Sequence, residues 1–332
     1  MFDSCNILIT SAGRRVALVN IFRKALQELN LPVKVVAVDM STLSSACMIS
    51  DASFVVPCCT LPEYVQDLLS LCEEQNVRLV IPTIDTELPA LAANRSEFAA
   101  KGVTVAVSSE ETIKVAGDKV ATHEYLLSRE FPTVRQALHH EVVRDLRRWS
   151  FPLIAKPRYG NSSRGVRYLY SPSELIERTD EDDYIIQAVA EGVEYTVDVY
   201  VDDAGRCRCA VPRQRIEVRA GEVSKAMTSH IPVLEDLATR VVEGLPGAYG
   251  VLNVQIFWDS ATESATIIEI NARFGGGYPL SDFAGAHFAR WMIEELCGLP
   301  STVSTNKWRS GIVMLRYDEA IFVEAQSVGL TA

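Results

Sequence analysis

Short apolar runs alternate with amphipathic stretches through the first third of the chain. Strands are predicted at residues 6–10, 34–38, 54–56, 78–81 and 103–107, and helices at residues 16–29, 62–74 and from residue 87 onward. The first helix carries apolar side chains at helical spacing from Val16 to Leu26, so one face can pack on a sheet. Because strands that alternate with helices form parallel sheets covered on both faces, this third is predicted to be an α/β domain.

The rest of the chain is richer in strands. Strands are expected at residues 151–156, 166–170, 184–189, 195–201, 206–212 and 308–317, and helices from residue 117 and at residues 284–296. Residues 251–257 and 266–271 alternate apolar and polar side chains on either side of a turn, which predicts a β-hairpin. A chain of 332 residues with this pattern should hold two or three subdomains.

The predicted hairpin carries polar side chains that can converge. Side chains two apart in a strand point the same way, so Glu269 and Asn271 project together, and Gln255 on the paired strand can join them. One carboxylate and two amide oxygens suit Mg²⁺, which completes its octahedron with water and phosphate oxygens. A nucleotide triphosphate would supply the missing negative charge. The alternative is a surface hairpin whose polar residues face solvent.

The residues after the hairpin favour a binding site. Arg273 continues the alternation, and Gly275, Gly276 and Gly277 follow it. Glycines let a backbone approach a ligand closely.

Charged residues also follow the strands of the first third. Arg14 and Arg15 come after the first strand, Asp39 after the second, and Asp85 and Glu87 after the fourth. Ligands of open α/β sheets collect at the carboxyl ends of the strands, so these residues are candidates for one wall of a substrate site. The alternatives are helix capping by Asp85 and solvated arginines. The turn Ser-Ala-Gly-Arg-Arg lacks the G-x-G-x-x-G spacing, which argues against a nicotinamide dinucleotide site.

A second motif suits phosphate groups. The strand at 151–156 ends in Lys156, and the turn that follows is rich in small residues, namely Gly160, Asn161, Ser162, Ser163 and Gly165. Backbone N–H groups and hydroxyls in such a turn can bind phosphate oxygens without steric obstruction. The order G-x-x-x-x-G-K-[ST] is absent, so the P-loop NTPase class is disfavoured.

Two arginines precede a segment with few core residues. Arg213 and Arg215 are expected on one face of a strand, where paired guanidinium groups suit a carboxylate or a transferring phosphoryl group. The alternative is the polar outer face of an edge strand, paired with Glu217. Residues 221–230 are expected to form a mobile loop over the site. His230 is not assigned a catalytic role, because a lone histidine is more often structural.

Composition narrows the class of protein. The formal net charge of −11 argues against a nucleic-acid-binding surface and favours a protein that acts on small molecules. Eight cysteines without a CxxC pair predict free thiols rather than disulfides or a zinc site. The N-terminal apolar run is too short for a secretion signal, and no apolar span of about 18 residues indicates a membrane helix. A cytoplasmic protein is therefore expected.

The order Gln255, Glu269, Asn271, Arg273 resembles the metal-binding strands of ATP-grasp enzymes, in particular the large subunit of carbamoyl phosphate synthetase and its short-form relatives. The resemblance covers essentially the whole chain. It implies a Rossmann-like preATP-grasp domain at residues 1–112, an ATP-grasp lid subdomain at 113–190, and an antiparallel-sheet body with the metal site at 191–332.

The resemblance also implies roles for individual residues. Lys119 and Lys156 would reach the ATP phosphates, Gln187, Ala188 and Val189 would hold the base, and Glu194 would bind the ribose. Mg²⁺, or Mn²⁺ in its place, would sit at Gln255, Glu269 and Asn271, with Arg273 and Arg215 on the developing charge. Substrate contacts would come from Arg213, Arg215, Asp85, Glu87, Gly276 and Gly277. The family usually has Glu where this chain has Gln187, and because an amide can both donate and accept, ATP should fit while purine selectivity stays undecided.

The implied activity is that of an ATP-dependent carboxylate-amine ligase, which forms an amide or peptide bond through an acyl phosphate and releases ADP and phosphate. The alternatives are an enzyme that forms carbamoyl or carboxy phosphate from bicarbonate, and a non-catalytic ATP-binding regulatory module. The expected partners are small carboxylate and amine substrates, and the resemblance also allows a homodimer. The sequence does not identify the two substrates or the pathway.

Overall fold

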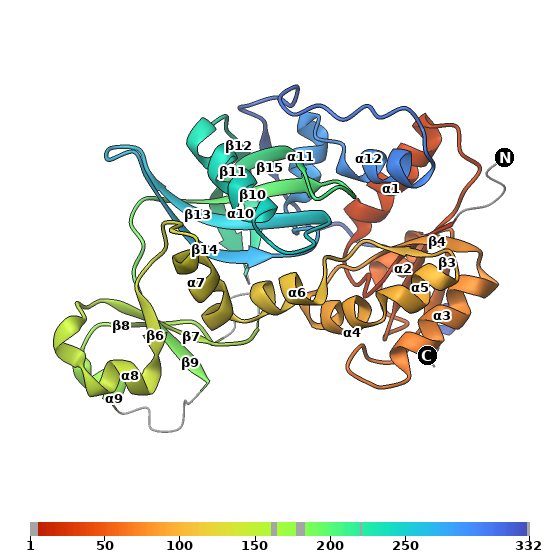
Figure 1. Cartoon of the computed structure of the whole chain (residues 1–332). Helices are drawn as coiled ribbons and strands as arrows, with labels where there is room; N and C mark the ends of the chain where they lie inside the picture. Colours follow the sequence, from red (N-terminus) through yellow and green to blue (C-terminus); the bar gives the residue numbers. More distant parts are fainter. Residues whose placement is uncertain (1–5, 161–164, 177–182, 220, 331–332) are drawn as a thin grey trace.

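Three β-sheets organise the chain (Figure 1). The computed structural model describes residues 6–160, 165–176, 183–219 and 221–330. A five-stranded parallel sheet forms the N-terminal domain, and two antiparallel sheets of four and six strands form a small lid and a larger body. The predicted α/β architecture is confirmed. Within the described residues, no helix has the length and apolar character needed to cross a bilayer.

The N-terminal sheet has the strand order β3-β2-β1-β4-β5. Residues of β1 and β2 alternate between two apolar cores, because Leu8 and Val36 pack on one face and Ile7 and Val35 on the other. Its elements are β1 (Asn6–Ile9), α1 (Val16–Glu28), β2 (Val35–Asp39), α2 (Ser45–Ile49), β3 (Ala52–Val55), α3 (Tyr64–Glu74), β4 (Val77–Ile81), the 3₁₀ turn η1 (Asp85–Glu87), α4 (Leu88–Ala93), α5 (Arg95–Ala100) and β5 (Thr104–Val105).

The lid is a four-stranded sheet in the order β6-β9-β7-β8. Leu153 and Ile186 pack with Val142 and Leu175 on one face. Ile154, Lys156 and Gln187 are offset by one residue and therefore stand on the other face. The lid contains β6 (Gln136–Leu138), α8 (His139–Arg144), η2 (Leu146–Arg148), β7 (Leu153–Pro157), β8 (Arg167–Leu169), α9 (Pro172–Ile176) and β9 (Tyr184–Ala188).

The body is a six-stranded sheet in the order β14-β13-β10-β11-β12-β15. Val197 and Val199 of β10 pack with α10, whereas Tyr200 stacks on Phe288 of α12 with ring centroids 5.8 Å apart. The remaining elements of the chain are α6 (Glu110–Gly117), α7 (Lys119–Ser128), β10 (Val193–Val201), β11 (Cys207–Arg219), β12 (Glu222–Thr228), α10 (Pro232–Glu243), β13 (Gly250–Asp259), β14 (Ser264–Asn271), α11 (Tyr278–Ala284), α12 (Phe288–Leu296), β15 (Val313–Leu315) and η3 (Ala325–Val328).

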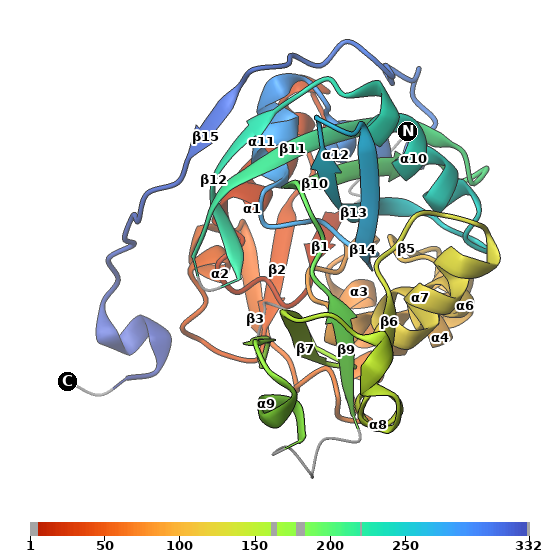
Figure 2. The same cartoon turned by 90° about the vertical axis from the view of Figure 1, so that its left-hand side faces the viewer.

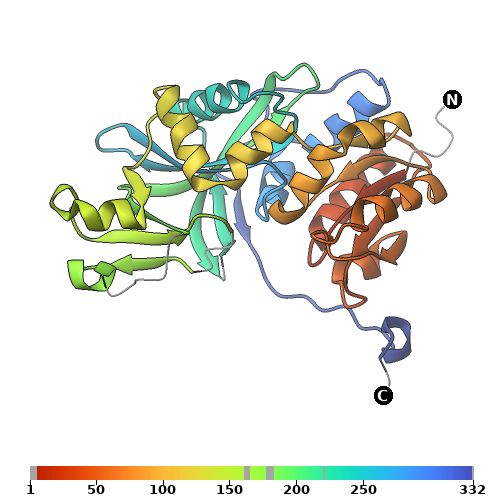
Figure 3. The ribbon, with the colours of Figure 1, turned by 60° about the horizontal axis from the view of Figure 1, so that its bottom comes forward.

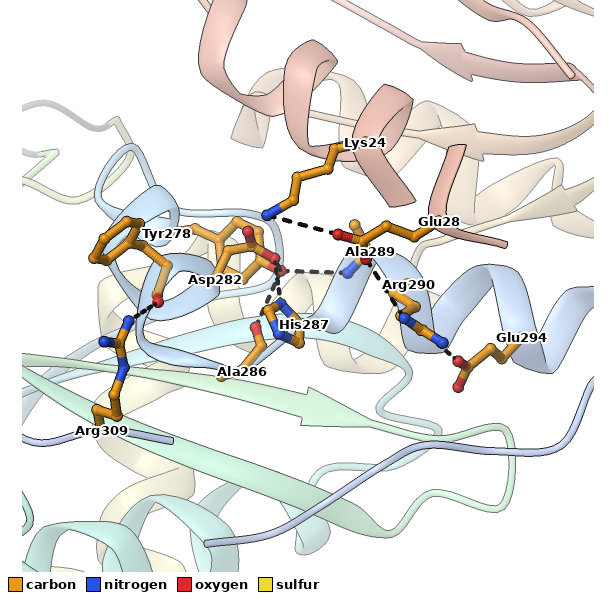
Figure 4. A network of polar contacts seen from close by, with 11 residues as sticks. Lys24, Glu28, Tyr278, Asp282, Ala286, His287, Ala289, Arg290, Glu294 and Arg309 are labelled. Carbon is orange, nitrogen blue, oxygen red and sulfur yellow. Dashed lines mark hydrogen bonds and ion pairs between the residues drawn. The ribbon is translucent and has the colours of Figure 1, made fainter. Parts of the chain in front are cut away.

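Helix α12 attaches the body to α1 of the N-terminal domain. Arg290 lies 3.4 Å from Glu28 of α1 and 2.7 Å from Glu294 one turn along its own helix (Figure 4). Beneath these ion pairs, Phe22 of α1 packs edge-on against Phe274 at a centroid distance of 5.9 Å. This packing places the end of β1 beside the glycines that follow β14.

The segment after β15 runs along the outside of the molecule (Figures 2 and 3). It returns to the N-terminal domain, where the Thr42 hydroxyl donates a hydrogen bond to the Val328 carbonyl at 2.8 Å.

Two predictions about elements were wrong. Residues 221–230 are not a loop over the site, because most of them form β12, which pairs with both β11 and β15. The helix expected from Ala284 begins at Phe288, because Gly285 has φ +117° and ends α11. The predicted hairpin is present as β13 and β14.

Candidate active site

The hairpin brings two of the three predicted metal ligands face to face. Gln255 of β13 is the direct cross-strand partner of Glu269 on β14, and Asn271 lies two residues further along. All three line one cavity of about 90 Å³, here called the central cavity. The described residues contain no cluster of three or more His, Cys, Asp or Glu side chains that could hold a metal. Any divalent ion here would be bound by one carboxylate and two amides.

Neighbouring hydrogen bonds orient the Asn271 amide. The Asn253 Nδ2 donates to the Arg273 carbonyl at 3.1 Å, so the Asn253 Oδ1 must be the acceptor of its pair with Asn271. The Asn271 Nδ2 donates to that oxygen at 3.2 Å, which leaves the Asn271 Oδ1 as an acceptor near Arg273. That oxygen accepts a long hydrogen bond of 3.3 Å from the Arg273 Nη2, and an amide oxygen is the kind of ligand that a hard cation prefers.

A larger cavity of about 270 Å³ lies between the lid and the body, here called the lid cavity. It is lined by the predicted nucleotide residues Lys119, Lys156, Gly160, Gln187, Ala188, Val189 and Glu194. Lys119 donates to the Gly160 carbonyl at 2.9 Å. Burial lowers the pKa of Lys156, which Glu269 partly offsets. Gly165 has φ +74° and does not line the cavity, and Asn161, Ser162 and Ser163 lie outside the described residues.

The sequence did not indicate an ion pair that joins the helix of Lys119 to the phosphate turn. Arg158 donates two hydrogen bonds to Asp118, at 2.9 and 2.6 Å, in a bidentate arrangement. Asp118 also caps α7 by accepting from the Val120 amide. Burial alone would raise the pKa of Asp118, but the hydrogen bonds from Arg158 and Val120 lower it. The motif Gly-Asp-Lys at the start of a helix was the sequence signal that could have indicated a capping and ion-pairing role for Asp118.

The Gln187 side chain belongs to a relay of amides. The Gln136 Nε2 donates to the Lys119 carbonyl at 2.8 Å, so the Gln136 Oε1 must accept the hydrogen bond from the Gln187 Nε2 at 2.6 Å. The relay therefore starts at a backbone carbonyl, which can only accept. It fixes the Gln187 Nε2 toward Gln136, and the Gln187 Oε1 is left as the acceptor on the other side.

The two predicted substrate arginines differ in their availability. Arg213 is 1% exposed and donates to both oxygens of Asp198, at 2.7 and 2.8 Å. It nevertheless lines the central cavity, so its role toward a substrate stays a prediction. Because β11 is an internal strand, the edge-strand alternative was wrong. Arg215 lines both the lid and central cavities, and its Nε lies 3.0 Å from Glu194.

Asp85 and Glu87 also have different surroundings. Asp85 accepts a hydrogen bond of 2.6 Å from Arg273, which connects the N-terminal domain to the central cavity. Glu87 is fully buried and accepts hydrogen bonds from Ser11, Tyr64 and the Thr83 amide, at 2.7 to 2.8 Å. The prediction that Glu87 faces a substrate was wrong, because these donors hold it beneath the turn after β1.

A third cavity of about 180 Å³, here called the outer cavity, lies at the end of β1. Gln255 and Glu269 line both the lid cavity and the central cavity. Arg15, Gly275 and Gly276 line both the central and the outer cavity. The three cavities thus adjoin one another through shared lining residues. Gln255 and Glu269 stand between the lid and central cavities, whereas Asn271 lines the central cavity but not the lid cavity. Gly277 lines the central cavity alone.

Two family models match parts of the chain. Residues 7–106 match the family described as PylC-like, N-terminal domain, and residues 180–320 match the family described as ATP-grasp in the biosynthetic pathway with Ter operon. The chain therefore combines a PylC-like N-terminal domain with an ATP-grasp domain.

Curated relatives are distant. The large chains of carbamoyl phosphate synthase from Thermotoga petrophila and Thermotoga maritima are each 22% identical over 306 residues, which is 82% of this chain and 27% of theirs. The chain thus spans about a quarter of the length of these relatives.

Solved structures share the fold. The biotin carboxylase domain of 2-oxoglutarate carboxylase from Hydrogenobacter thermophilus, in complex with MgADP, ADP and bicarbonate, superposes with a TM-score of 0.73 at 17% identity, covering 92% of this chain and 73% of that domain. N5-carboxyaminoimidazole ribonucleotide synthetase from Thermotoga maritima gives a TM-score of 0.68 at 18% identity, with coverage of 90% and 78%. The Aspergillus clavatus enzyme of that kind, complexed with ATP, gives 0.73 at 18% identity, with coverage of 95% and 82%.

Proposed function

We propose that the protein is an ATP-dependent carboxylate-amine ligase that works through an acyl phosphate. The observation that carries the proposal is the wall formed by Gln255 and Glu269, which faces a lysine-lined cavity on one side and an arginine-lined cavity on the other. The first suits a nucleotide triphosphate and the second a carboxylate. Phosphoryl transfer needs positioning and charge neutralisation at such a boundary rather than covalent participation by the protein.

The proposed reaction has two steps. In the first step a carboxylate oxygen of the substrate bonds to the γ-phosphorus of ATP, the bond to the β-phosphate oxygen breaks, and ADP leaves. In the second step an amine bonds to the acyl carbon, phosphate leaves with the bonding electrons, and the amine loses a proton. Lys119 and Lys156 neutralise the triphosphate, while Arg273 and Arg215 face the charge that develops on the acyl phosphate.

The donor set also fits magnesium. Glu269, Gln255 and the oriented Asn271 Oδ1 would hold Mg²⁺, which would neutralise charge on the phosphate oxygens. The MgADP bound in the Hydrogenobacter thermophilus domain supports this cofactor by analogy of fold.

The amide relay favours adenine in the lid cavity. Adenine presents an exocyclic amine that can donate to the Gln187 Oε1, whereas guanine presents a carbonyl oxygen at the equivalent position. Because the relay from the Lys119 carbonyl fixes the Gln187 oxygen as an acceptor, we expect the amide to retain the adenine preference that a carboxylate would give.

A screen for phosphate release tests the proposal. The purified protein is incubated with MgATP and mixtures of small carboxylates, amino acids and amines, and hydroxylamine is added to trap acyl phosphates as hydroxamates. We expect carboxylate-dependent release of ADP together with a hydroxamate. Release of ADP without any carboxylate dependence would refute the ligase.

Bicarbonate defines the second candidate function. The Hydrogenobacter thermophilus domain of similar fold was solved in complex with bicarbonate, and the central cavity of about 90 Å³ is small. If the protein makes carboxy phosphate, ADP release will depend on bicarbonate and not on any organic carboxylate, which the same screen distinguishes.

A further inference from the structure

The outer cavity carries a concentration of positive charge. It is lined by Arg14, Arg15 and Arg316, and Glu222 is the acidic residue among its lining side chains. These side chains give the cavity a net charge of two positive, in a protein whose formal net charge is −11. A local field opposite in sign to that of the whole chain concentrates anions.

Glu222 does not neutralise the three arginines. Its carboxylate lies 3.1 Å from Arg316 and 3.8 Å from Arg14. Burial alone would raise the pKa of Glu222, but Arg15, Arg316 and Arg14 lower it. Burial and the neighbouring Arg273 lower the pKa of Arg15 to about 10, so it remains charged at neutral pH. Asp85 also favours the charge of Arg15, but its carboxylate is paired with Arg273. The lining of the outer cavity itself therefore has one carboxylate and three guanidinium groups, each with five N–H donors.

Hydrogen bonds to two carboxylates hold the turn that carries Arg14 and Arg15. The Gly13 amide donates to Asp39 at 2.7 Å, and the Ser11 hydroxyl donates to the buried Glu87 at 2.8 Å. The arginines therefore begin from a backbone that needs little ordering on binding. Helix α1 starts at this turn without an acidic residue in its first turn and without a side-chain cap, so its positive end also faces the region.

We propose that the outer cavity binds an anionic group of the substrate that does not itself react. The reacting group of the same molecule lies in the central cavity beside Arg273. Both cavities share Arg15 and Gly276, and a Cβ at residue 276 would lie 3.2 Å from the Arg15 Nη1, so glycine keeps the passage open. The substrate class is a small molecule with a carboxylate or phosphate separated from its reacting carboxylate or amine, such as an amino acid, a dicarboxylate or a phosphorylated acid.

This inference rests on the proposed function, and a turnover experiment tests it first. ADP release is measured with matched pairs of compounds that differ only in a second anionic group, for example succinate and its monoamide, an amino acid and the corresponding amine, and a phosphorylated acid and its alcohol. We expect turnover with the charged member of the active pair. Arg14→Gln and Arg316→Gln should each raise the KM for that compound about tenfold while the KM for ATP stays unchanged. Arg240→Gln, which removes an exposed arginine of α10, is the matched control. Equal turnover of both members of the active pair would overturn the inference.

A binding experiment separates failure of this inference from failure of the proposed function. Calorimetric titration of the wild type with succinate, inorganic phosphate and acetate, in the presence of a non-hydrolysable ATP analogue with Mg²⁺, measures anion binding without turnover. Tighter binding of succinate than of acetate, lost in Arg14→Gln and Arg316→Gln, supports anion binding in the outer cavity even if no ligase activity is found. Tighter binding of phosphate than of succinate assigns the bound anionic group to a phosphate. Anion binding that survives in both variants, or no binding of any of the three, contradicts it.

Discussion

Replacing Gln136 by leucine should weaken the discrimination between ATP and GTP. Gln136 does not line the lid cavity, but its Oε1 accepts the hydrogen bond of 2.6 Å that fixes the Gln187 amide. Leucine has a similar size and cannot accept, so the Gln187 amide becomes free to turn and to offer its Nε2 to the cavity. An amide that can present either a donor or an acceptor no longer distinguishes an exocyclic amine from a carbonyl oxygen.

The magnitude follows from one hydrogen bond. In the wild type, guanine would place a carbonyl oxygen against the Gln187 Oε1, which forfeits a hydrogen bond and leaves two acceptors together at a cost of about 1–3 kcal/mol. That cost corresponds to a preference for ATP of roughly 5- to 150-fold. In Gln136→Leu this contribution falls toward zero, so the ratio of kcat/KM for ATP to that for GTP should fall by the same factor, roughly 5- to 150-fold.

The assay compares kcat/KM for the two nucleotides in the wild type, Gln136→Leu and Gln66→Leu. Gln66 is an exposed glutamine of α3 and serves as the matched control. Because Gln136 acts through Gln187, a structural role alone would lower activity with both nucleotides equally. An unchanged ratio in a folded Gln136→Leu protein would refute the relay.

Three further predictions concern charge and packing. Because burial lowers the pKa of Lys156 below that of an ordinary lysine, kcat/KM for ATP should fall as the pH rises through that lowered value, and in Lys156→Arg the fall should move to higher pH, which a pH–rate profile measures. Asp198→Ala leaves the buried Arg213 without its carboxylate and should lower the free energy of unfolding by about 3–5 kcal/mol. Urea denaturation measures this change, and a fall of less than about 1 kcal/mol would contradict the prediction. Gly277→Ala makes a Cβ overlap the buried Arg213 Nη1 and should lower the melting temperature, whereas Gly117→Ala meets no atom within 4 Å and should not. Equal melting temperatures of the two variants would contradict this packing.

Features within one segment were predictable from the sequence. The hairpin alternation placed Gln255 opposite Glu269, because period-two patterns fix which side chains share a face. The same local logic placed Lys156 at the end of a strand that lines the lid cavity. Neither prediction needed knowledge of distant contacts.

Features that depend on distant segments were not predictable. Glu87 looked like an accessible acid, but Ser11, Tyr64 and Thr83 converge on it from separate elements. Residues 221–230 looked like a loop because β12 buries the polar Ser224 and Thr228. Their partners lie on β11 and near β15, and only the assembled sheet satisfies them.

The central claim is that a metal ion is bound where the lid and central cavities meet, and Glu269→Gln tests it most directly. Glutamine keeps the shape of the side chain and removes the single carboxylate among the three proposed metal ligands. At saturating MgATP and substrate, ADP release should fall by about 100-fold or more, because weakening even an outer partner of a metal ligand costs 10–100-fold. Glu263→Gln, in the exposed turn of the same hairpin, should release ADP at the wild-type rate. A folded Glu269→Gln protein that releases ADP as fast as the wild type would contradict the account.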